Sequence, residues 1–498
     1  MTFPSAGCET CKIRRIKCDE TRPTCQRCLK SRRICYGMGA LAAVHIENSY
    51  ASGVKKRPRG PRSSLQKRGP IGFESILTGD WVELKTRAML YYYNHYLKAP
   101  RDTPKVLKAL SEDYLLAWIP KLESPIIDLA VSCMALAVFS RRYKYQPAAI
   151  EASVNYHQLL QVARTSMPSL VVSDVDTCLL SIFFMSRYED VVYESKDLDQ
   201  QAVGARSFRH HDGALSILEM WKHRLSADQP ATDIMKYTRR GMIKSALLRK
   251  RSLPTWIVEG AIFGERGLEL EYDRIITRLV NLRCEVFEYL KSHSESDRPE
   301  AEKLAQEARD IDKTLEHWAL HFPSSWSYQR YTLSDHGQFP TRNFFSPSVY
   351  NYSSLAHAAV WNQYYSTRML SLSTRIRILQ SDQFQAVAAL DRELAECVSC
   401  ADNMTFDLAS SLPYSLERFK LGELDATPTP EQPTIRESKE EIRPYFSSMT
   451  IWPLSLATNL ENIQNRQVFW LRGRLQDLGR MSGYGMLESI ANTPWLRL

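Results

Sequence analysis

Six cysteines lie within 28 residues near the start of this chain, and their spacing constrains the fold more than any other feature. Each half of the group has two cysteines separated by two residues and a third cysteine after six more. The second half repeats the first with an offset of 17 residues. The six residues are Cys8, Cys11, Cys18, Cys25, Cys28 and Cys35. Closely spaced cysteine pairs of this kind are typical of metal sites.

The number of cysteines indicates how many metal ions they hold. A zinc ion bound by thiolates takes four ligands in a tetrahedron. One zinc ion would leave two of the six cysteines idle, whereas two zinc ions need eight ligand positions. Six thiolates fill eight positions when two are shared, and the repeat favours the leading cysteine of each half, Cys8 and Cys25. The sequence therefore predicts two Zn²⁺ ions per chain.

Two other interpretations of the cysteines are less favoured. A disulfide framework is typical of secreted chains, but no apolar signal segment follows Met1. A single zinc ion held by four of the thiolates would leave the symmetric spacing without a purpose.

A basic segment fills the gap between the second and third cysteines. At helical spacing over 12–17, Ile13 and Ile16 share one face, while Arg14 and Lys17 share another. This pattern predicts a short basic helix anchored to metal at both ends. Such a helix is too short to be stable alone in water, so zinc binding has to supply its folding free energy.

The basic side chains indicate a nucleic-acid partner. Arginine pairs with the O6 and N7 acceptors of guanine in the major groove, so we expect Arg14 and Arg15 to reach base edges. Lys12 and Lys17 are expected to contact phosphates, and Arg32 and Arg33 of the second half are expected to lie against the DNA backbone. A solvated basic surface around a structural zinc site is the alternative.

The stretch 8–35 resembles the fungal binuclear zinc cluster, Zn2Cys6. All six spacings agree, and Pro23 stands in the connecting loop where the family has a proline. The resemblance implies that the first and fourth cysteines bridge the two metals and that the first helix reads a CGG triplet. It places Arg15 where the family usually has a guanine-contacting lysine, a change that keeps the charge but alters the donor geometry. It also implies a nuclear transcription factor that regulates RNA polymerase II transcription.

Charge and composition separate the N-terminal arm from the rest. Residues 1–70 carry 16 Lys and Arg against 4 Asp and Glu, whereas the other 428 residues carry 49 against 52. We expect a DNA-binding domain over 1–36 and a flexible linker rich in Gly, Pro and Ser over 37–79. The linker has no sustained apolar heptad, so a coiled-coil dimer directly behind the zinc is not expected, and a homodimer formed elsewhere stays open.

A cluster of Lys and Arg within this linker predicts a nuclear localisation signal or additional phosphate contacts. A linker whose charges serve solubility alone is the alternative. The cluster comprises Lys55, Lys56, Arg57, Arg59 and Arg62.

Residues 80–498 predict a large all-α regulatory domain. Ser124 and Pro125 read as the start of a helix, and an apolar stripe within 299–320 fits a helix buried in its own domain better than one that pairs with a second chain. An aromatic-rich loop is expected over 323–349, and an exposed or disordered loop over 412–446.

This body resembles the fungal-specific transcription-factor regulatory domain. The residues that carry the resemblance are Tyr91, Tyr92 and Tyr93, the stretch Phe208–Leu215, and the segment Trp452–Leu454.

Other chemistry has little support in the sequence. No phosphate-binding glycine loop, nucleophile elbow or H-E-x-x-H motif occurs, so we expect no enzyme. Cys397 and Cys400 are interpreted as reduced core thiols, and the run His210-His211-Asp212 as capping and surface hydrogen bonding. The apolar run over 126–139 is too short to span a membrane.

The expected partners are double-stranded DNA and the transcription machinery or its coregulators, with no membrane. Two alternatives to a DNA reader stay open: a zinc scaffold that binds another protein, and a helical regulator controlled by a small-molecule effector.

Overall fold

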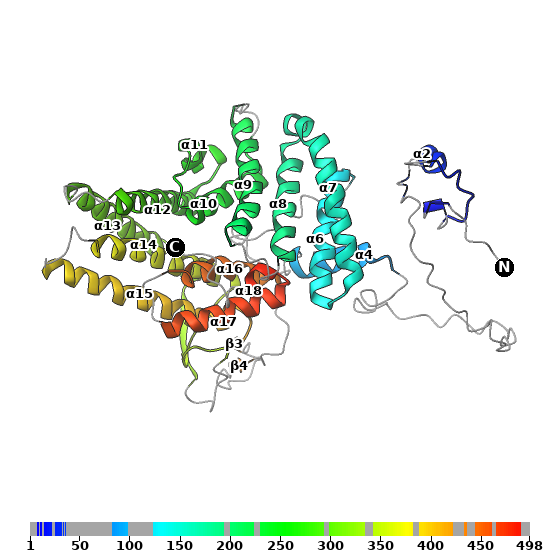
Figure 1. Ribbon diagram of the computed structural model, residues 1–498. Helices are drawn as coiled ribbons and strands as arrows, with labels where there is room; N and C mark the ends of the chain where they lie inside the picture. The colour runs from blue at the N-terminus through cyan, green and yellow to red at the C-terminus, as the bar shows by residue number, and fades with distance from the viewer. Residues whose placement is uncertain are drawn as a thin grey trace. The chain divides into compact units, whose positions relative to one another are not determined.

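The computed structural model divides the chain into two compact units, Met1–Ile71 and Gly72–Leu498, and each is described by itself (Figure 1). The residues that the structure describes are 7–8, 10–11, 14–21, 25–31, 33, 35, 82–97, 123–193, 200–223, 230–292, 298–333, 342–381, 388–421, 433–435, 444–460 and 465–489.

The N-terminal unit contains a helical turn at Thr10 and Cys11 and the short helix α2 (Gln26–Lys30). Among its described residues, four buried cysteines form the core, and Ile16, Cys18 and Cys35 pack against them. So small a set of apolar side chains cannot stabilise a fold by burial alone. The unit therefore depends on what the sulfur atoms bind.

The described residues of the larger unit are mostly helical, which confirms the all-α prediction. Its N-terminal elements are α4 (Leu84–Tyr92), the π-helical η1 (Tyr93–Leu97), α6 (Pro125–Tyr143), α7 (Gln146–Ser173), α8 (Val175–Val192) and α9 (Gln200–Lys222). The middle elements are α10 (Asp233–Arg249), α11 (Thr255–Val258), the 3₁₀ helix η3 (Gly260–Phe263), α12 (Gly267–Ser292) and α13 (Arg298–Leu320). The C-terminal helices are η4 (Ser324–Trp326), α14 (Leu355–Leu379), α15 (Ala388–Ser415), α16 (Pro444–Ala457), α17 (Asn465–Ser482) and α18 (Gly485–Ser489).

Helix α6 is the centre of the N-terminal part of this unit. Ser124 is its N-cap residue and Pro125 opens it, as the sequence predicts. Every residue over 130–140 is buried, because α4, α7 and α8 all pack against α6 (Figure 1). Its apolar sequence is thus explained by burial within the protein, and no described helix is long and apolar enough to cross a bilayer.

Helix α13 buries its apolar stripe within the same unit. It lies against α12 and α14. Trp318 also donates its indole N–H to the carbonyl of Leu268 at 2.9 Å. The stripe residues Leu304, Ala308, Ile311, Leu315 and Trp318 are all buried. The prediction that this helix packs within its own domain is confirmed.

In the part of the unit that the structure describes, two short sheets interrupt the helices. Strands β1 (Tyr328–Thr332) and β2 (Ser348–Tyr352) pair antiparallel, with Tyr328 opposite Tyr352. Strands β3 (Phe419–Leu421) and β4 (Pro433–Ile435) pair likewise. The expectation of a plain loop over 323–349 is therefore wrong. Its aromatic residues form strands because β2 buries its side chains against α14 and α15.

The expected loop over 412–446 contains structured ends. Helix α15 continues through Ser415, Phe419 in β3 is buried, and α16 begins at Pro444. Most of the segment between β3 and α16 lies outside the described residues.

A buried ion pair holds the middle of the larger unit together. Arg239 on α10 has no exposed surface and donates to both carboxylate oxygens of Asp273 on α12, at 2.5 and 2.6 Å. Its Nε also donates to the carbonyl of Ile257 at 2.7 Å. A Cβ at Gly260 would overlap the Asp273 carboxylate, so only glycine fits beside this pair.

Candidate metal centre and nucleic-acid interface

The repeat in the sequence is reproduced in the hydrogen bonds of the N-terminal unit. In each half, the second cysteine donates its backbone N–H to the sulfur of the first at 3.4 Å: Cys11 to Cys8, and Cys28 to Cys25. In each half a later backbone N–H then donates to the carbonyl of the second cysteine and closes the turn. Ile16 donates to Cys11 at 3.1 Å, and Arg33 donates to Cys28 at 3.0 Å. Two similar turns therefore present two sulfur atoms each.

The six sulfur atoms form two groups of four. One group contains Cys8, Cys11, Cys18 and Cys25, and the other contains Cys8, Cys25, Cys28 and Cys35; within each group all sulfur atoms lie within 4.8 Å of one another. Both groups include Cys8 and Cys25, whose sulfur atoms are 3.6 Å apart. No other group of metal-ligating side chains occurs among the residues that the structure describes.

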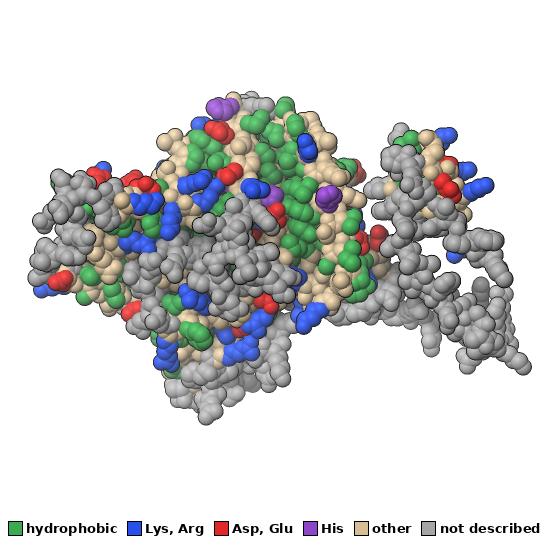
Figure 2. Space-filling view, viewed as in Figure 1, with side chains coloured by type: hydrophobic (Ala, Val, Ile, Leu, Met, Phe, Trp, Pro, Cys, Tyr) green, Lys and Arg blue, Asp and Glu red, His purple; other side chains and the backbone are tan. Residues whose placement is uncertain are grey.

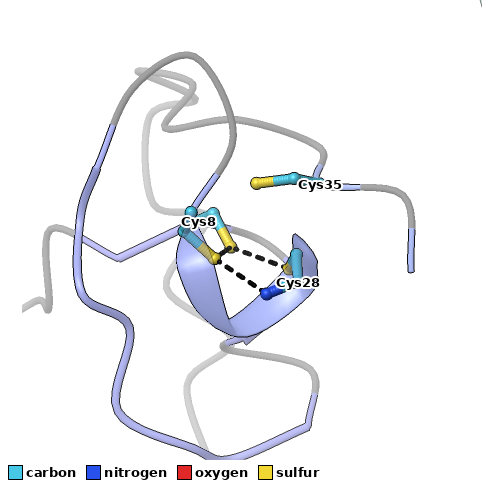
Figure 3. A group of neighbouring side chains, drawn as sticks. Cys8, Cys28 and Cys35 are labelled. Atoms are coloured by element: carbon cyan, nitrogen blue, oxygen red, sulfur yellow. Dashed lines mark hydrogen bonds between the residues drawn. The ribbon is translucent and has the colours of Figure 1, made fainter. Parts of the chain in front are cut away.

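The distances between sulfur atoms fit tetrahedral zinc. With Zn–S bonds of 2.3 Å, the edge of a ZnS₄ tetrahedron is about 3.8 Å. The Cys8 and Cys28 sulfur atoms are 3.8 Å apart, and those of Cys11 and Cys25 are 3.7 Å apart. Figure 3 shows the side chains of Cys8 and Cys28 directed toward each other, while Cys35 approaches from a separate segment. The donor set therefore suits two zinc ions that share Cys8 and Cys25.

Burial changes the acidity of these thiols. Desolvation raises the pKa of Cys8 to about 12 and also raises the pKa of Cys25 and Cys11. By contrast, backbone N–H groups of Cys8 and Glu20 donate to Cys18 and lower its pKa. A metal ion that binds such thiols must displace their protons, so binding couples to folding and to proton release.

Asp19 is an important residue of this unit that the sequence analysis missed. Its Oδ1 accepts the backbone N–H of Gln26 at 3.0 Å, and its Oδ2 accepts that of Arg27 at 2.9 Å. A hydrogen bond from the Thr21 hydroxyl and these backbone donors hold the pKa of Asp19 well below its usual range. Asp19 thus ties the segment after Cys18 to the start of α2. The one signal in the sequence was an acidic residue directly after a predicted ligand.

Gly7 allows the chain to close around the third cysteine. A Cβ built on Gly7 would lie 2.6 Å from the Cβ of Cys18. Only glycine therefore permits this approach of the backbone before Cys8 to the segment that carries Cys18.

The predicted basic helix is shorter than expected. Arg15 has a φ of 52°, in the left-handed region that ends helices, and residues 16–20 are not helical. The expectation that the helix continues to Lys17 is wrong. The physical reason is that the backbone N–H of Ile16 donates to the carbonyl of Cys11, five residues earlier, at 3.1 Å, a bond that closes a helix after a left-handed residue and leaves Ile16 packed against the cysteine core.

The structure places the predicted DNA-contacting residues in different environments. Arg15, Lys17 and Arg33 are exposed, whereas Arg14 is half-buried and donates its Nη1 to the hydroxyl of Ser31 at 3.0 Å. Lys and Arg side chains are visible on the surface of this unit in Figure 2. Lys12 and Arg32 lie outside the described residues, as do Lys55, Lys56, Arg57, Arg59 and Arg62.

The histidine run in the larger unit joins helices. His210 on α9 lies 3.1 Å from Glu189 on α8, and Asp212 pairs with Arg249 on α10. Burial lowers the pKa of His211 to about 4. The run lies in the interior of α9 and caps no helix end, so the expected capping role is wrong, and its contacts join neighbouring helices.

The cysteine pair on α15 lies in or near the core. Burial raises the pKa of Cys397 to about 11 and also raises that of Cys400. Both properties are those of inert, reduced thiols.

Comparison with known proteins places residues 6–38 in one family of domains. They match the fungal Zn(2)-Cys(6) binuclear cluster domain. Transcription factor lfc1 of Flammulina velutipes is 53% identical over 34 residues, which are 7% of this chain and 12% of that protein. White-opaque regulator 2 of Candida albicans is 58% identical over 38 residues, 8% of each chain.

A third relative shows the same pattern. The aspercryptin biosynthesis cluster-specific transcription regulator atnN of Emericella nidulans is 61% identical over 35 residues, 7% of this chain and 6% of that protein. The chain thus matches only about a tenth or less of the length of these relatives. No solved structure matches. The resemblance of residues 80–498 to a regulatory domain stays a prediction.

Proposed function

We propose that this chain, whose residues 6–38 form a fungal Zn(2)-Cys(6) binuclear cluster domain that binds two zinc ions, is a sequence-specific DNA-binding transcription factor. The observation that carries the proposal is the pair of four-sulfur groups that share Cys8 and Cys25, next to exposed basic side chains. All six cysteines serve as zinc ligands in this proposal. The proposed function involves no catalysed reaction.

Zinc supplies the charge that keeps the six thiolates deprotonated and joins the two halves of the unit. The chain itself supplies the recognition surface. Arg15 follows the helical turn in a left-handed conformation and is exposed, so its guanidinium is available to the O6 and N7 atoms of guanine. In this proposal it reads guanine within the CGG-like half-site that the resemblance to the family implies.

The other cations of this unit position it on the duplex. Lys17 and Arg33 are exposed and contact phosphates, together with Lys12 and Arg32. Each neutralised phosphate steepens the dependence of log K on log salt by about 0.9. These residues set affinity and register, whereas sequence preference comes from base contacts.

The remaining parts of the chain serve the same function. The basic cluster around Lys55–Arg62 directs the protein to the nucleus, where the target is RNA polymerase II transcription. The helical unit regulates the DNA-binding unit or recruits coregulators. This proposal is compatible with a homodimer and with a small-molecule effector that binds the helical unit.

The test is selection of bound duplexes from a random pool by the full chain. A recovered CGG-like half-site, single or in a spaced pair, supports the proposal. Recovery of unrelated sequences with no common element contradicts it, and a chain that retains no duplex while it carries two zinc ions is a zinc scaffold for another partner. The matched control is the Cys8→Ser chain, which should recover nothing above background.

A further inference from the structure

The two halves of the N-terminal unit meet through residues that are equivalent in the 17-residue repeat. The sulfur atoms of Cys8 and Cys25 are 3.6 Å apart, and those of Cys11 and Cys28 are 4.0 Å apart. Each of these pairs joins a residue of the first half to the residue 17 positions later. The contacts therefore lie along the approximate symmetry axis that relates the halves.

Arg14 and Ser31 form a third pair of the same kind. They too are 17 positions apart, and Arg14 Nη1 donates to Ser31 Oγ at 3.0 Å. The positions of the three pairs advance by three residues in each half, so they follow one face of a helical turn. The first two pairs consist of the predicted zinc ligands. The third pair contains no metal ligand and lies next to Arg15.

The hydroxyl of Ser31 is well placed to hold the guanidinium. Ser31 Oγ lies 2.8 Å from the carbonyl oxygen of Arg27, to which it can donate its single proton. Its lone pairs are then free to accept from Arg14. The cation of Arg14 also lies near the carbonyl end of α2, where positive charge is favourable.

We infer that Arg14 is a positioning residue that acts through Ser31, rather than a residue that reads bases. This inference rests on the proposed function and goes beyond it. The Arg14–Ser31 bond fixes the turn that carries Arg15, because Arg14 immediately precedes the left-handed residue. This assignment differs from the sequence-based expectation that Arg14 and Arg15 both reach base edges.

The experiment is a double-mutant cycle in the full chain, with Arg14→Ala, Ser31→Ala and the two combined. Ser31→Thr keeps the hydroxyl and serves as the matched control. Two quantities are measured: the rate of zinc transfer to a chelator, and the affinity for the selected duplex at several salt concentrations. Ser31→Ala removes no charge, so a change in its salt dependence would not be expected.

The inference predicts that each single alanine variant speeds zinc transfer and weakens duplex binding by about threefold to tenfold. In both measurements the double variant should differ from Arg14→Ala by no more than about twofold, since the two substitutions remove the same hydrogen bond. Ser31→Thr should behave like the parent chain, and the salt slope should stay unchanged in every variant.

Two results would overturn the inference. One is a double variant in which the fold-changes in zinc transfer and duplex affinity equal the product of those of the two single variants. The other is a loss seen for Arg14→Ala alone, with a salt slope lower by about one, which would make Arg14 a phosphate contact. If the parent chain selects no duplex, the proposed function fails, but the zinc-transfer cycle still decides whether Arg14 and Ser31 act as one unit. If Arg14→Ala does not load zinc, the comparison of Ser31→Ala with Ser31→Thr decides it.

Discussion

The carboxylate of Asp19 accepts the backbone N–H of Arg27 at 2.9 Å, across the boundary between the two halves of the cysteine repeat. The same carboxylate accepts the N–H of Gln26 at 3.0 Å. Both donors belong to the first turn of α2, which contains no acidic residue of its own. Asp19 therefore satisfies two of the N–H groups at the start of the helix, and the Thr21 hydroxyl also accepts that of Gln26 at 3.1 Å.

The first prediction concerns this bond. Asp19→Ala should speed zinc transfer to a chelator, because the start of α2, and with it Cys25 and Cys28, then keeps only the bond from Gln26 to Thr21 as its link to the segment after Cys18. Gln26→Ala changes an exposed residue of the same helix and is the control. Equal transfer rates for Asp19→Ala and the parent chain would show that the carboxylate does not hold the two halves together.

The second prediction separates shared from single ligands. Cys8→Ser should lose both zinc ions, because its sulfur belongs to both groups of four. Cys35 belongs to one group only, so the Cys35→Ser chain should retain one zinc ion. Native mass spectrometry counts the bound metal, and Cys284→Ser, outside this unit, is the control. One zinc ion retained by Cys8→Ser would remove Cys8 from the shared position.

The third prediction assigns roles to the exposed cations. Arg15→Ala should weaken binding to the selected site by about 1–3 kcal/mol and relax preference at one base pair. Lys17→Ala should weaken binding to all sequences alike and reduce the salt slope by about one. Binding titrations against matched and mismatched duplexes measure both effects. A uniform loss for Arg15→Ala would reassign it to phosphate.

How far the sequence predicted this unit depends on the kind of interaction. The sulfur groups were predictable because tetrahedral coordination fixes how many ligands each metal needs, and the repeat indicates which ligands are equivalent. The role of Asp19 was not, because its partners at Gln26 and Arg27 are set by the folded loop and by no local pattern. The end of the first helix at Arg15 was missed because a non-glycine residue in the left-handed conformation, closed by the bond from Ile16 N–H to the carbonyl of Cys11, has no local sequence pattern.

In the larger unit, helices such as α6 and α13 were predictable from apolar periodicity and capping residues. The strands at 328–332 and 348–352 were not, because they pair across an intervening segment, and only the second of them buries its aromatic side chains against α14 and α15. Local sequence gives little information about pairing of this kind.

The fourth prediction concerns pH. Burial lowers the pKa of His211 to about 4, below its usual value of 6.5. The unfolded chain therefore binds a proton at His211 before the folded chain does. The contribution to stability is full above pH 6.5 and is lost as the pH falls toward 4, by on the order of 2 kcal/mol. Denaturant unfolding of His211→Gln should show a weaker pH dependence over that range.

The control for this measurement is His223→Gln. His223 is exposed and directly follows α9. A change in pH dependence that both variants share would not come from burial of the His211 imidazole. An identical pH dependence for His211→Gln and the parent chain would show that His211 is protonated equally in both states.

The most direct measurement of the central claim is binding of the full chain to its selected duplex before and after complete removal of zinc, followed by return of the metal. The account predicts that specific binding is lost with the zinc and restored with it, because the metal holds together the turns that carry Arg15 and Lys17. Unchanged specific binding by the metal-free chain would contradict it.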